Sequence, residues 1–187
     1  MGYDEKNFKA KANIKARRLW LVFAILLTAN YGTDTANGAY SVSNYIIFVI
    51  LCWLPFVYGD ILLKKKGKDN DHYRLAFVIG YGIFYVFLLC TTTSPIAFTY
   101  ILPIISLIVI FKDEKFMIYC AVANMLSLIA SIAFHIFVLG QNTAVDHKNY
   151  QLQIACLLLC YIGYIMSVRH LTESDACLLY TSPSPRD

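Results

Sequence analysis

The side chains of this 187-residue chain that could do chemistry are sparse, and their spacing does not form a reaction centre. Cys156 and Cys160 lie one helical turn apart, but a tetrahedral zinc site needs further ligands that the neighbouring sequence does not supply. The histidines fall in four separate segments and form no HxxxH or HExxH pair: His72, His135, His147 and His170. We therefore expect no catalytic residue, cofactor or metal, and no enzymatic activity.

Three polar residues fall within long apolar stretches, where ionisable groups have functional roles more often than elsewhere. We expect Asp60 to anchor its segment, at the headgroups or by pairing with Lys64, with a proton or ion site as the alternative. His135 is interpreted as a capped or packed histidine, and a ligand site or pH sensor is the alternative. Asn124 lies deeper and is expected to hydrogen-bond to a neighbouring helix.

Polar and aromatic side chains also gather at the ends of the apolar stretches that would face the exterior. The simpler interpretation is an interfacial aromatic belt of the kind that anchors membrane proteins. The alternative is a shallow ligand pocket that opens outward between helices, and it is the one small-molecule site that the sequence offers. Its candidate residues are Asn30, Tyr31, Asn44, Tyr45, Tyr100, His135 and Gln151.

The composition decides which elements must position these residues. Hydrophobic residues make up 58% of the chain and charged residues 15%, against about 45–50% and about 25% in soluble domains. The charges lie in short runs between long uncharged tracts. The sequence therefore predicts an integral membrane protein of the all-α class. The six cysteines indicate no compartment, because five lie in apolar runs and none belongs to an extramembrane framework.

The apolar tracts predict a bundle of six transmembrane helices within a membrane domain at residues 19–168. Pro55 is expected to bend the second helix and Pro103 to interrupt the fourth. A signal peptide is the alternative for the first helix. Residues 1–18 are interpreted as a basic cytosolic leader, with a surface helix attracted to anionic lipid as the alternative. The predicted spans are residues 19–36, 45–63, 75–93, 96–111, 116–139 and 151–168.

The basic residues predict the orientation of these helices. With a cytosolic N-terminus, fourteen of the sixteen Lys and Arg residues lie on the cytosolic side, and Lys148 is alone outside. Such an excess on one side is typical of cytoplasmic loops in multi-pass proteins. The sequence therefore predicts both ends in the cytosol and a place in the plasma membrane. The same scatter of cations between spans excludes a nucleic-acid groove.

Several short strings resemble a known family, and together they cover roughly residues 10–175. The strings are NYG (30–32), LCWLPF (51–56), GYGIFY (80–85), SPIAFTYILP (94–103), YQLQ (150–153) and MSVRHLTESD (166–175). They resemble the N-terminal six-helix membrane region of clostridial methyl-accepting chemotaxis proteins. The resemblance implies a sensory input module that forms homo-oligomers. In that family the last helix continues into a cytosolic coiled coil that binds a histidine kinase and its adaptor.

That coiled coil is not found in this sequence, so we expect the chain to be the input part of a longer transducer. Residues 169–187 would then comprise a cytosolic exit, with Arg169, His170 and Glu173 passing a displacement of the last helix onward. The final residues, 177–187, resemble translated sequencing-adapter read-through and are expected not to belong to the natural protein. Pro183 and Pro185 are expected to end any helix there.

Two alternatives remain open from the sequence. The same input module is compatible with another output, such as a histidine kinase or a diguanylate cyclase. A small six-span transporter or permease subunit belongs to a different class of protein. Such a transporter is expected to carry several buried charges or paired half-helices, and neither pattern occurs here. Transport by the chain alone would distinguish this alternative from the sensory one.

Overall fold

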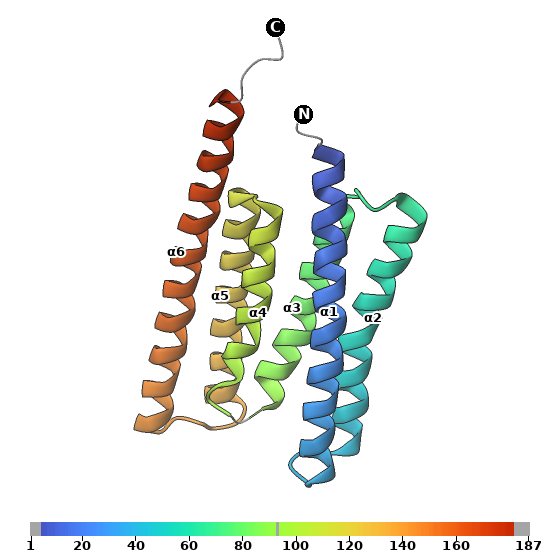
Figure 1. Ribbon diagram of the computed structural model, residues 1–187. Helices are drawn as coiled ribbons and strands as arrows, with labels where there is room; N and C mark the ends of the chain where they lie inside the picture. Colours follow the sequence, from blue (N-terminus) through green and yellow to red (C-terminus); the bar gives the residue numbers. More distant parts are fainter. Residues whose placement is uncertain (1–4, 93, 182–187) are drawn as a thin grey trace, which may run out of the picture. The chain divides into compact units, whose positions relative to one another are not determined.

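The computed structural model describes residues 5–92 and 94–181, and every regular element within these ranges is helical. Six α-helices are present (Figure 1): α1 (Glu5–Ala36), α2 (Val42–Lys66), α3 (His72–Thr91), α4 (Leu102–Ile108), α5 (Glu114–Phe137) and α6 (Ala144–Thr181). Two 3₁₀ segments flank α4, namely η1 (Ala97–Ile101) and η2 (Val109–Phe111). The predicted all-α class is confirmed. Of the predicted tail, residues 177–187, the part at 182–187 lies outside the described residues, and with it the helix stop expected at Pro183 and Pro185.

Four of these helices are long and apolar enough to cross a membrane: α2, α3, α5 and the Ala144–Cys177 part of α6. Their outward faces are apolar as well as their inward faces, with Leu54 at 64% exposure and Leu126 at 62%. A helix that is apolar all round requires a lipid or protein environment on every side. The apolar stretch Ala97–Phe111 is shorter than these four. The chain therefore has the helices of a membrane-associated protein.

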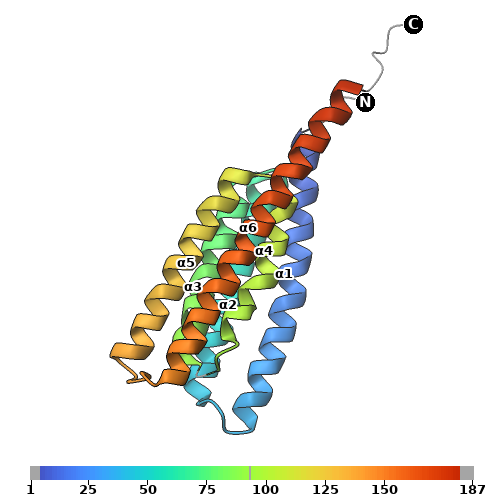
Figure 2. The same ribbon diagram turned by 90° about the vertical axis from the view of Figure 1, so that its left-hand side faces the viewer.

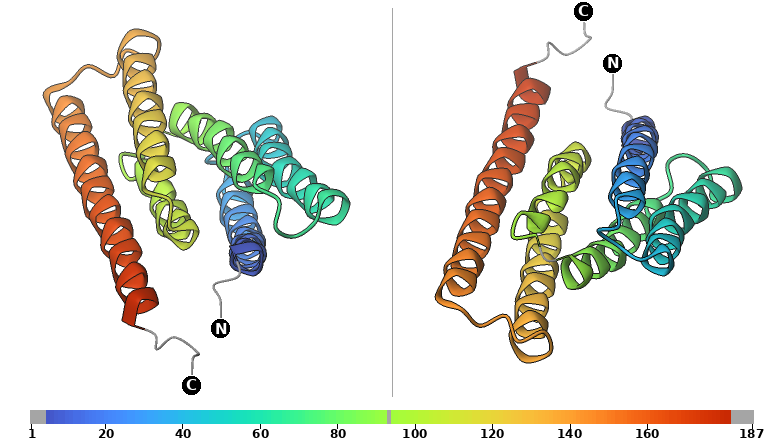
Figure 3. Two further views of the ribbon diagram at one scale, coloured as in Figure 1. Left: turned by 90° about the horizontal axis from the view of Figure 1, so that it is seen from above. Right: turned by 90° about the horizontal axis from the view of Figure 1, so that it is seen from below.

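The chain divides into two compact units, Met1–Ala97 and Phe98–Asp187. In the first unit, α1 packs against α2, and α2 packs against α3 (Figure 3). Ser41 caps the start of α2, because its side-chain oxygen accepts a hydrogen bond from the Asn44 amide at 3.2 Å. Helix α1 runs without a break across the boundary between the predicted leader, residues 1–18, and the first predicted span. Ala12, Asn13 and Ala16, all from the predicted leader, are buried.

Aromatic side chains fill the interior of the first unit near the α1–α2 connection. Tyr31 of α1 stacks on Tyr40 and on Phe48 of α2, with ring centroids 4.3 Å and 4.2 Å apart. Phe48 then meets the edge of Phe84 of α3 at 5.0 Å. Stacked and edge-to-face rings of this kind contribute about 0.5–1.5 kcal/mol per pair beyond their burial. Rings from three helices therefore hold this part of the unit together.

The same ladder of rings continues toward the α2–α3 connection. Tyr81 of α3 lies 5.2 Å from Trp20 of α1, and Trp20 lies 5.1 Å from Phe77. Trp20 is 2% exposed, so α1 supplies a large side chain to the interior. Removal of α1 as a signal peptide would uncover this interior. The packing therefore favours a retained first helix over the signal-peptide alternative.

Two glycines let α2 and α3 approach closely. A Cβ placed on Gly80 would overlap the ring of Pro55, lying 2.8 Å from its Cγ. A Cβ on Gly59 would lie 2.8 Å from the Tyr73 ring. Pro55 sits inside α2 without ending it. The prolyl ring, which costs α2 one backbone hydrogen bond, thus fills the space above Gly80.

In the second unit, α6 packs against α5 and α4 (Figure 2). Its interior is mainly aliphatic, with Ile105, Met117, Leu128 and Leu157 fully buried beside the aromatic Tyr161. Asp113 caps α5 by accepting a hydrogen bond from the Phe116 amide at 2.9 Å. Pro103 occupies the first turn of α4, where its missing N–H costs least. The stretch predicted as a proline-interrupted span is therefore a short α-helix between two 3₁₀ turns.

The contact between Gly80 and Pro55 predicts a difference between two neighbouring glycines of α3. Gly80→Ala is expected to destabilise the protein by about 1–3 kcal/mol, because the added methyl group overpacks the interface. Gly82→Ala is the matched control, since a Cβ there meets nothing within 4 Å and alanine favours a helix. The measurement is the free energy of unfolding in detergent. Equal stability of the two variants would contradict the close approach.

Candidate functional site

The polar end of α6 is tied to the start of α5 by an ion pair. The Arg169 guanidinium donates a hydrogen bond from its Nη2 to the Glu114 carboxylate at 2.8 Å. Glu114 belongs to the first turn of α5, where a carboxylate is also favoured by the unpaired amides of the helix start. The pair joins residues that are 55 positions apart in the sequence.

A second ion pair lies six residues further along α6. Lys112 Nζ pairs with the Asp175 carboxylate, and both side chains are partly buried. Lys112 ends η2 with a left-handed backbone, φ 50° and ψ 36°. Helix α5 begins shortly after it, at Glu114. We refer to the Arg169–Glu114 and Lys112–Asp175 pairs together as the exit contacts.

The face of α6 that carries Asp175 continues back into the interior of the unit. Leu157, Tyr161 and Val168 are buried at spacings of four and seven residues, and Asp175 follows seven residues after Val168. The Asn124 side-chain amide donates a hydrogen bond to the Tyr161 hydroxyl across the α5–α6 interface. The expectation that Asn124 bonds to a neighbouring helix is confirmed. One face of α6 is thus held to α5 at two levels, in the apolar interior and at the exit.

The predicted exit residues are not equivalent in the structure. Arg169 takes part in the exit contacts, whereas His170 and Glu173 are exposed on α6. The sequence prediction did not include Glu114, Lys112 or Asp175. Their charges were visible in the short 112–115 turn and in the exit, but nothing in the sequence indicated which cation meets which carboxylate.

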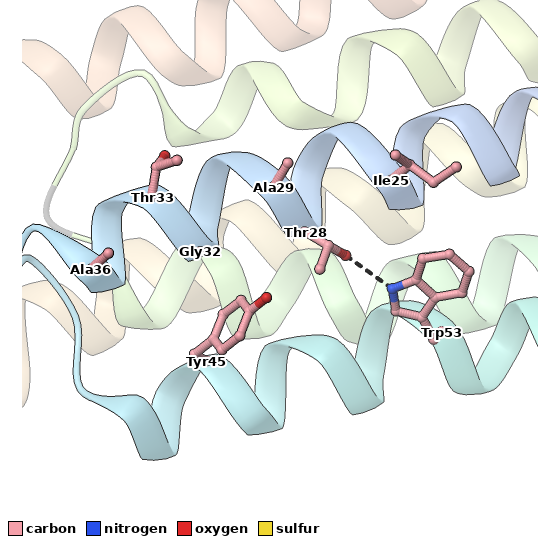
Figure 4. A pocket seen from close by; sticks show the side chains of 8 residues that line it. All are labelled: Ile25, Thr28, Ala29, Gly32, Thr33, Ala36, Tyr45 and Trp53. Atoms are coloured by element: carbon pink, nitrogen blue, oxygen red, sulfur yellow. Dashed lines mark hydrogen bonds between the residues drawn. The ribbon is translucent and has the colours of Figure 1, made fainter.

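A groove runs between α1 and α2 in the first unit (Figure 4). It is open, has a volume of about 450 Å³, and is lined mainly by small and apolar residues of α1. Tyr45 and Trp53 of α2 form its other wall. The Trp53 indole nitrogen donates a hydrogen bond to the Thr28 hydroxyl at 2.9 Å. The α1 residues of the groove are Ile25, Thr28, Ala29, Gly32, Thr33 and Ala36.

Of the four candidate pocket residues in the first unit, Tyr45 lines this groove. Tyr31 is buried in the ring ladder, with 5% of its surface exposed. Asn30 lies on the exposed surface of α1, and Asn44 lies half-buried in the first turn of α2. The groove therefore brings one of these residues, Tyr45, to an open surface.

The other three candidates belong to the second unit. His135 is 8% exposed, and its Nδ1 lies 2.7 Å from the Gln141 side-chain oxygen. Tyr100 is half-buried in η1, and Gln151 is exposed on α6. The partner of His135 is thus the loop residue Gln141. That contact matches the packed or capped interpretation, and the ligand pocket stays a prediction.

Asp60 lies among cations near the end of α2. Its carboxylate oxygen lies 3.1 Å from Lys64 Nζ, and the same carboxylate also pairs with Nε of Arg17 on α1. The expected pairing with Lys64 is confirmed, and Arg17 is a partner that the sequence did not indicate. The Arg17–Asp60 pair ties α1 to α2, and Lys64 adds a second cation from the helix that carries Asp60.

The exit contacts predict that neutral substitutions will loosen the end of α6. Arg169→Gln and Lys112→Gln are each expected to speed amide hydrogen exchange over residues 169–177 several-fold, since each removes an ion pair worth about 0.2–1 kcal/mol. Lys115→Gln is the matched control, because Lys115 is exposed in the same turn and carries the same charge. If the control speeds exchange equally, the exit contacts are not what holds this segment.

The Asn124–Tyr161 bond predicts a coupling between α5 and α6. Tyr161→Phe and Asn124→Ala should each lower the free energy of unfolding. In the double variant the losses should fall short of additive by about 0.6–2 kcal/mol, the range for interhelical hydrogen bonds in membrane proteins. Unfolding in mixed detergent for all four forms provides the measurement. Strictly additive losses would mean that the two groups do not interact.

Comparison with known proteins identifies no protein similar to this chain. The chain matches no family model, no curated protein and no solved structure. Functional interpretation therefore depends on the contacts described above and on the resemblance carried by the short strings.

Proposed function

We propose that this chain is the membrane input module of a methyl-accepting chemotaxis-type signal transducer. In this proposal it spans the bacterial plasma membrane six times, as a homo-oligomer with both ends in the cytosol. It senses within or at the outer edge of the membrane and catalyses no reaction. A displacement of α6 is its output, and a histidine kinase with its adaptor responds through a cytosolic region that follows this helix.

The observation that carries the proposal is the course of α6. This single helix starts before its apolar stretch and continues without a break through the polar exit past Asp175. Its exit is held to the α4–α5 turn by charged pairs, which are weaker and more easily exchanged than apolar packing. In this proposal a small shift of α6 breaks and re-forms these pairs, and this exchange is the switch.

The distribution of charge supports the proposed orientation. In the first unit Lys9 of α1 meets Asp71 of the α2–α3 connection at 3.2 Å, so these two basic segments share one end. In the second unit the exit contacts bring the basic 112–115 turn to the exit of α6. Apart from Lys148, the cations named for each unit thus gather at one end of that unit, as the positive-inside rule expects of a cytosolic side.

The proposed orientation has a direct test. Lys65 and Lys115 are both exposed in the structure, and in intact cells they are expected to be protected from a membrane-impermeant amine reagent. Permeabilised cells should label both. Labelling of either lysine in intact cells would overturn the proposed topology.

The proposed signalling role is tested with a hybrid transducer. Residues 1–175 are joined to the cytosolic signalling region of a methyl-accepting chemotaxis protein and expressed in cells that lack their own receptors. The hybrid is expected to support kinase activity, and Glu114→Lys, which repels Arg169, is expected to shift that activity. Lys115→Glu, a charge reversal in the same turn away from the exit contacts, should leave it near the parent level.

Two outcomes would contradict the signalling role. A hybrid that is inserted in the membrane and yet leaves the kinase unaffected, with or without Glu114→Lys, would remove its support. Uptake of a solute by vesicles that contain this chain alone would favour the transporter alternative. Replacement of the signalling region by that of a diguanylate cyclase distinguishes which output the module can drive.

A further inference from the structure

Two basic segments of the first unit are held side by side by one buried amide. Asn13, on α1, is 3% exposed. Its Nδ2 donates hydrogen bonds to the Lys68 carbonyl at 2.9 Å and to the Asn70 carbonyl at 3.0 Å. Asn13 thereby fixes the first half of α1 against the α2–α3 connection. The cations of both segments are presented at the same end of the unit.

Ion pairs divide these cations into two sets. Lys9 lies 3.0 Å from Glu5 and 3.2 Å from Asp71, and hydrogen bonds to those carboxylates raise the pKa of its ammonium group. Arg17 and Lys64 share Asp60. Most of the carboxylates at this end are thus paired with Lys or Arg side chains, and these ion pairs help to hold the unit together.

The second set consists of exposed cations with no ion pair among the residues that the structure describes. On α1 they follow one another at spacings of four and three, so they form a single stripe, and Asn13 and Trp20 are buried on the opposite face. Lys6 is exposed too but lies off this stripe, so the set is taken as Lys11, Lys15 and Arg18 of α1 with Lys65, Lys66 and Lys68 of the second segment. We call it the basic surface.

We propose that the basic surface docks onto anionic phospholipid headgroups. The inference rests on the proposed placement of this end in the cytosolic headgroup region. Clusters of four to eight Lys and Arg residues next to a transmembrane helix attract anionic lipid. Each of the six side chains is long enough to reach a phosphate while its stem lies along apolar surface.

A membrane is the partner that the surroundings of this surface fit. The stripe on α1 ends at Arg18, and Leu19, Leu21 and Val22 follow at once with 37%, 37% and 48% of their surfaces exposed. On α2, Ile61 lies just before the cations of the second segment and is 44% exposed. Exposed apolar side chains directly beside exposed cations reproduce the order of acyl chains and headgroups across one leaflet.

The test measures which lipids the protein retains. Full-length protein is reconstituted in vesicles of phosphatidylcholine with a minority of phosphatidylglycerol, and the lipids that remain bound are identified by native mass spectrometry. Phosphatidylglycerol is expected to be enriched over its share of the vesicle. Each Lys→Gln change is expected to lower that enrichment by up to about fivefold at low salt, the equivalent of about 1 kcal/mol per cation near a membrane surface.

Two triple variants, K11Q/K15Q/R18Q and K65Q/K66Q/K68Q, should therefore lose most of the enrichment. K65R/K66R/K68R, which keeps the charge, should retain it. Lys148→Gln and Lys115→Gln are single-charge controls outside the surface, and both should match the parent protein. Added salt should weaken the preference, because screening shortens the reach of the exposed charges.

Asn13→Ala tests whether the two segments act as one surface, because it changes no charge. It is expected to lose part of the enrichment while helicity, measured by circular dichroism, is kept. Parent-like enrichment in Asn13→Ala would mean that the segments bind independently. Parent-like enrichment in both triple variants would overturn the proposal, as would equal losses in the Lys148 and Lys115 controls.

The assay also separates this inference from the proposed function. The vesicles offer phosphatidylglycerol in both leaflets, so the enrichment does not depend on which way the protein is inserted. Sidedness is measured independently by lysine labelling in cells. A reversed orientation with intact enrichment would contradict the topology alone, and lost enrichment with correct sidedness would contradict the basic surface alone.

Discussion

Hydrocarbon offers no hydrogen-bond partner, and this constraint shapes the chain at every level. Backbone amides within a bilayer must be satisfied inside the protein, which is why the long apolar stretches are helices. Side chains follow the same constraint. Most of the charged contacts fall at the ends of the apolar stretches, as for Arg17 with Asp60 and Arg169 with Glu114. Asn124, deeper in α5, is satisfied across a helix interface by Tyr161.

The two units meet this constraint with different interiors. The first is filled by aromatic rings, whose edges and faces bring three helices together around Trp20, Phe48 and Phe84. The second is mainly aliphatic, and among the described residues the Asn124–Tyr161 bond is a buried polar contact between α5 and α6. Ring contacts contribute less to this interior than to that of the first unit.

Residue patterns that act locally were readable from the sequence. The all-α class follows from long apolar tracts, and the pairing of Asp60 with Lys64 follows from their spacing of four. The cross-helix bond of Asn124 follows from the cost of an unpaired amide in an apolar interior. In each case one short segment contained all the information that was needed.

Features that depend on distant partners were not readable. Residues 1–18 have the charge of a leader, and the double hydrogen bond of Asn13 involves carbonyls 55 and 57 positions away. The exit contacts join residues 55 and 63 positions apart. The predicted ligand pocket combined side chains from both units by their expected depth alone, and depth does not determine which of them face one another.

Lys112 lies under two demands that no single natural residue satisfies together. Its left-handed backbone favours glycine, or asparagine among residues with side chains. Its pairing with Asp175 requires a long cation, which neither of those residues provides. Glycine here would relax the turn and release the end of α6, whereas arginine would keep the charge and the unfavourable backbone. An unfavourable backbone conformation at Lys112 is thus accepted in exchange for an ion pair that holds α6.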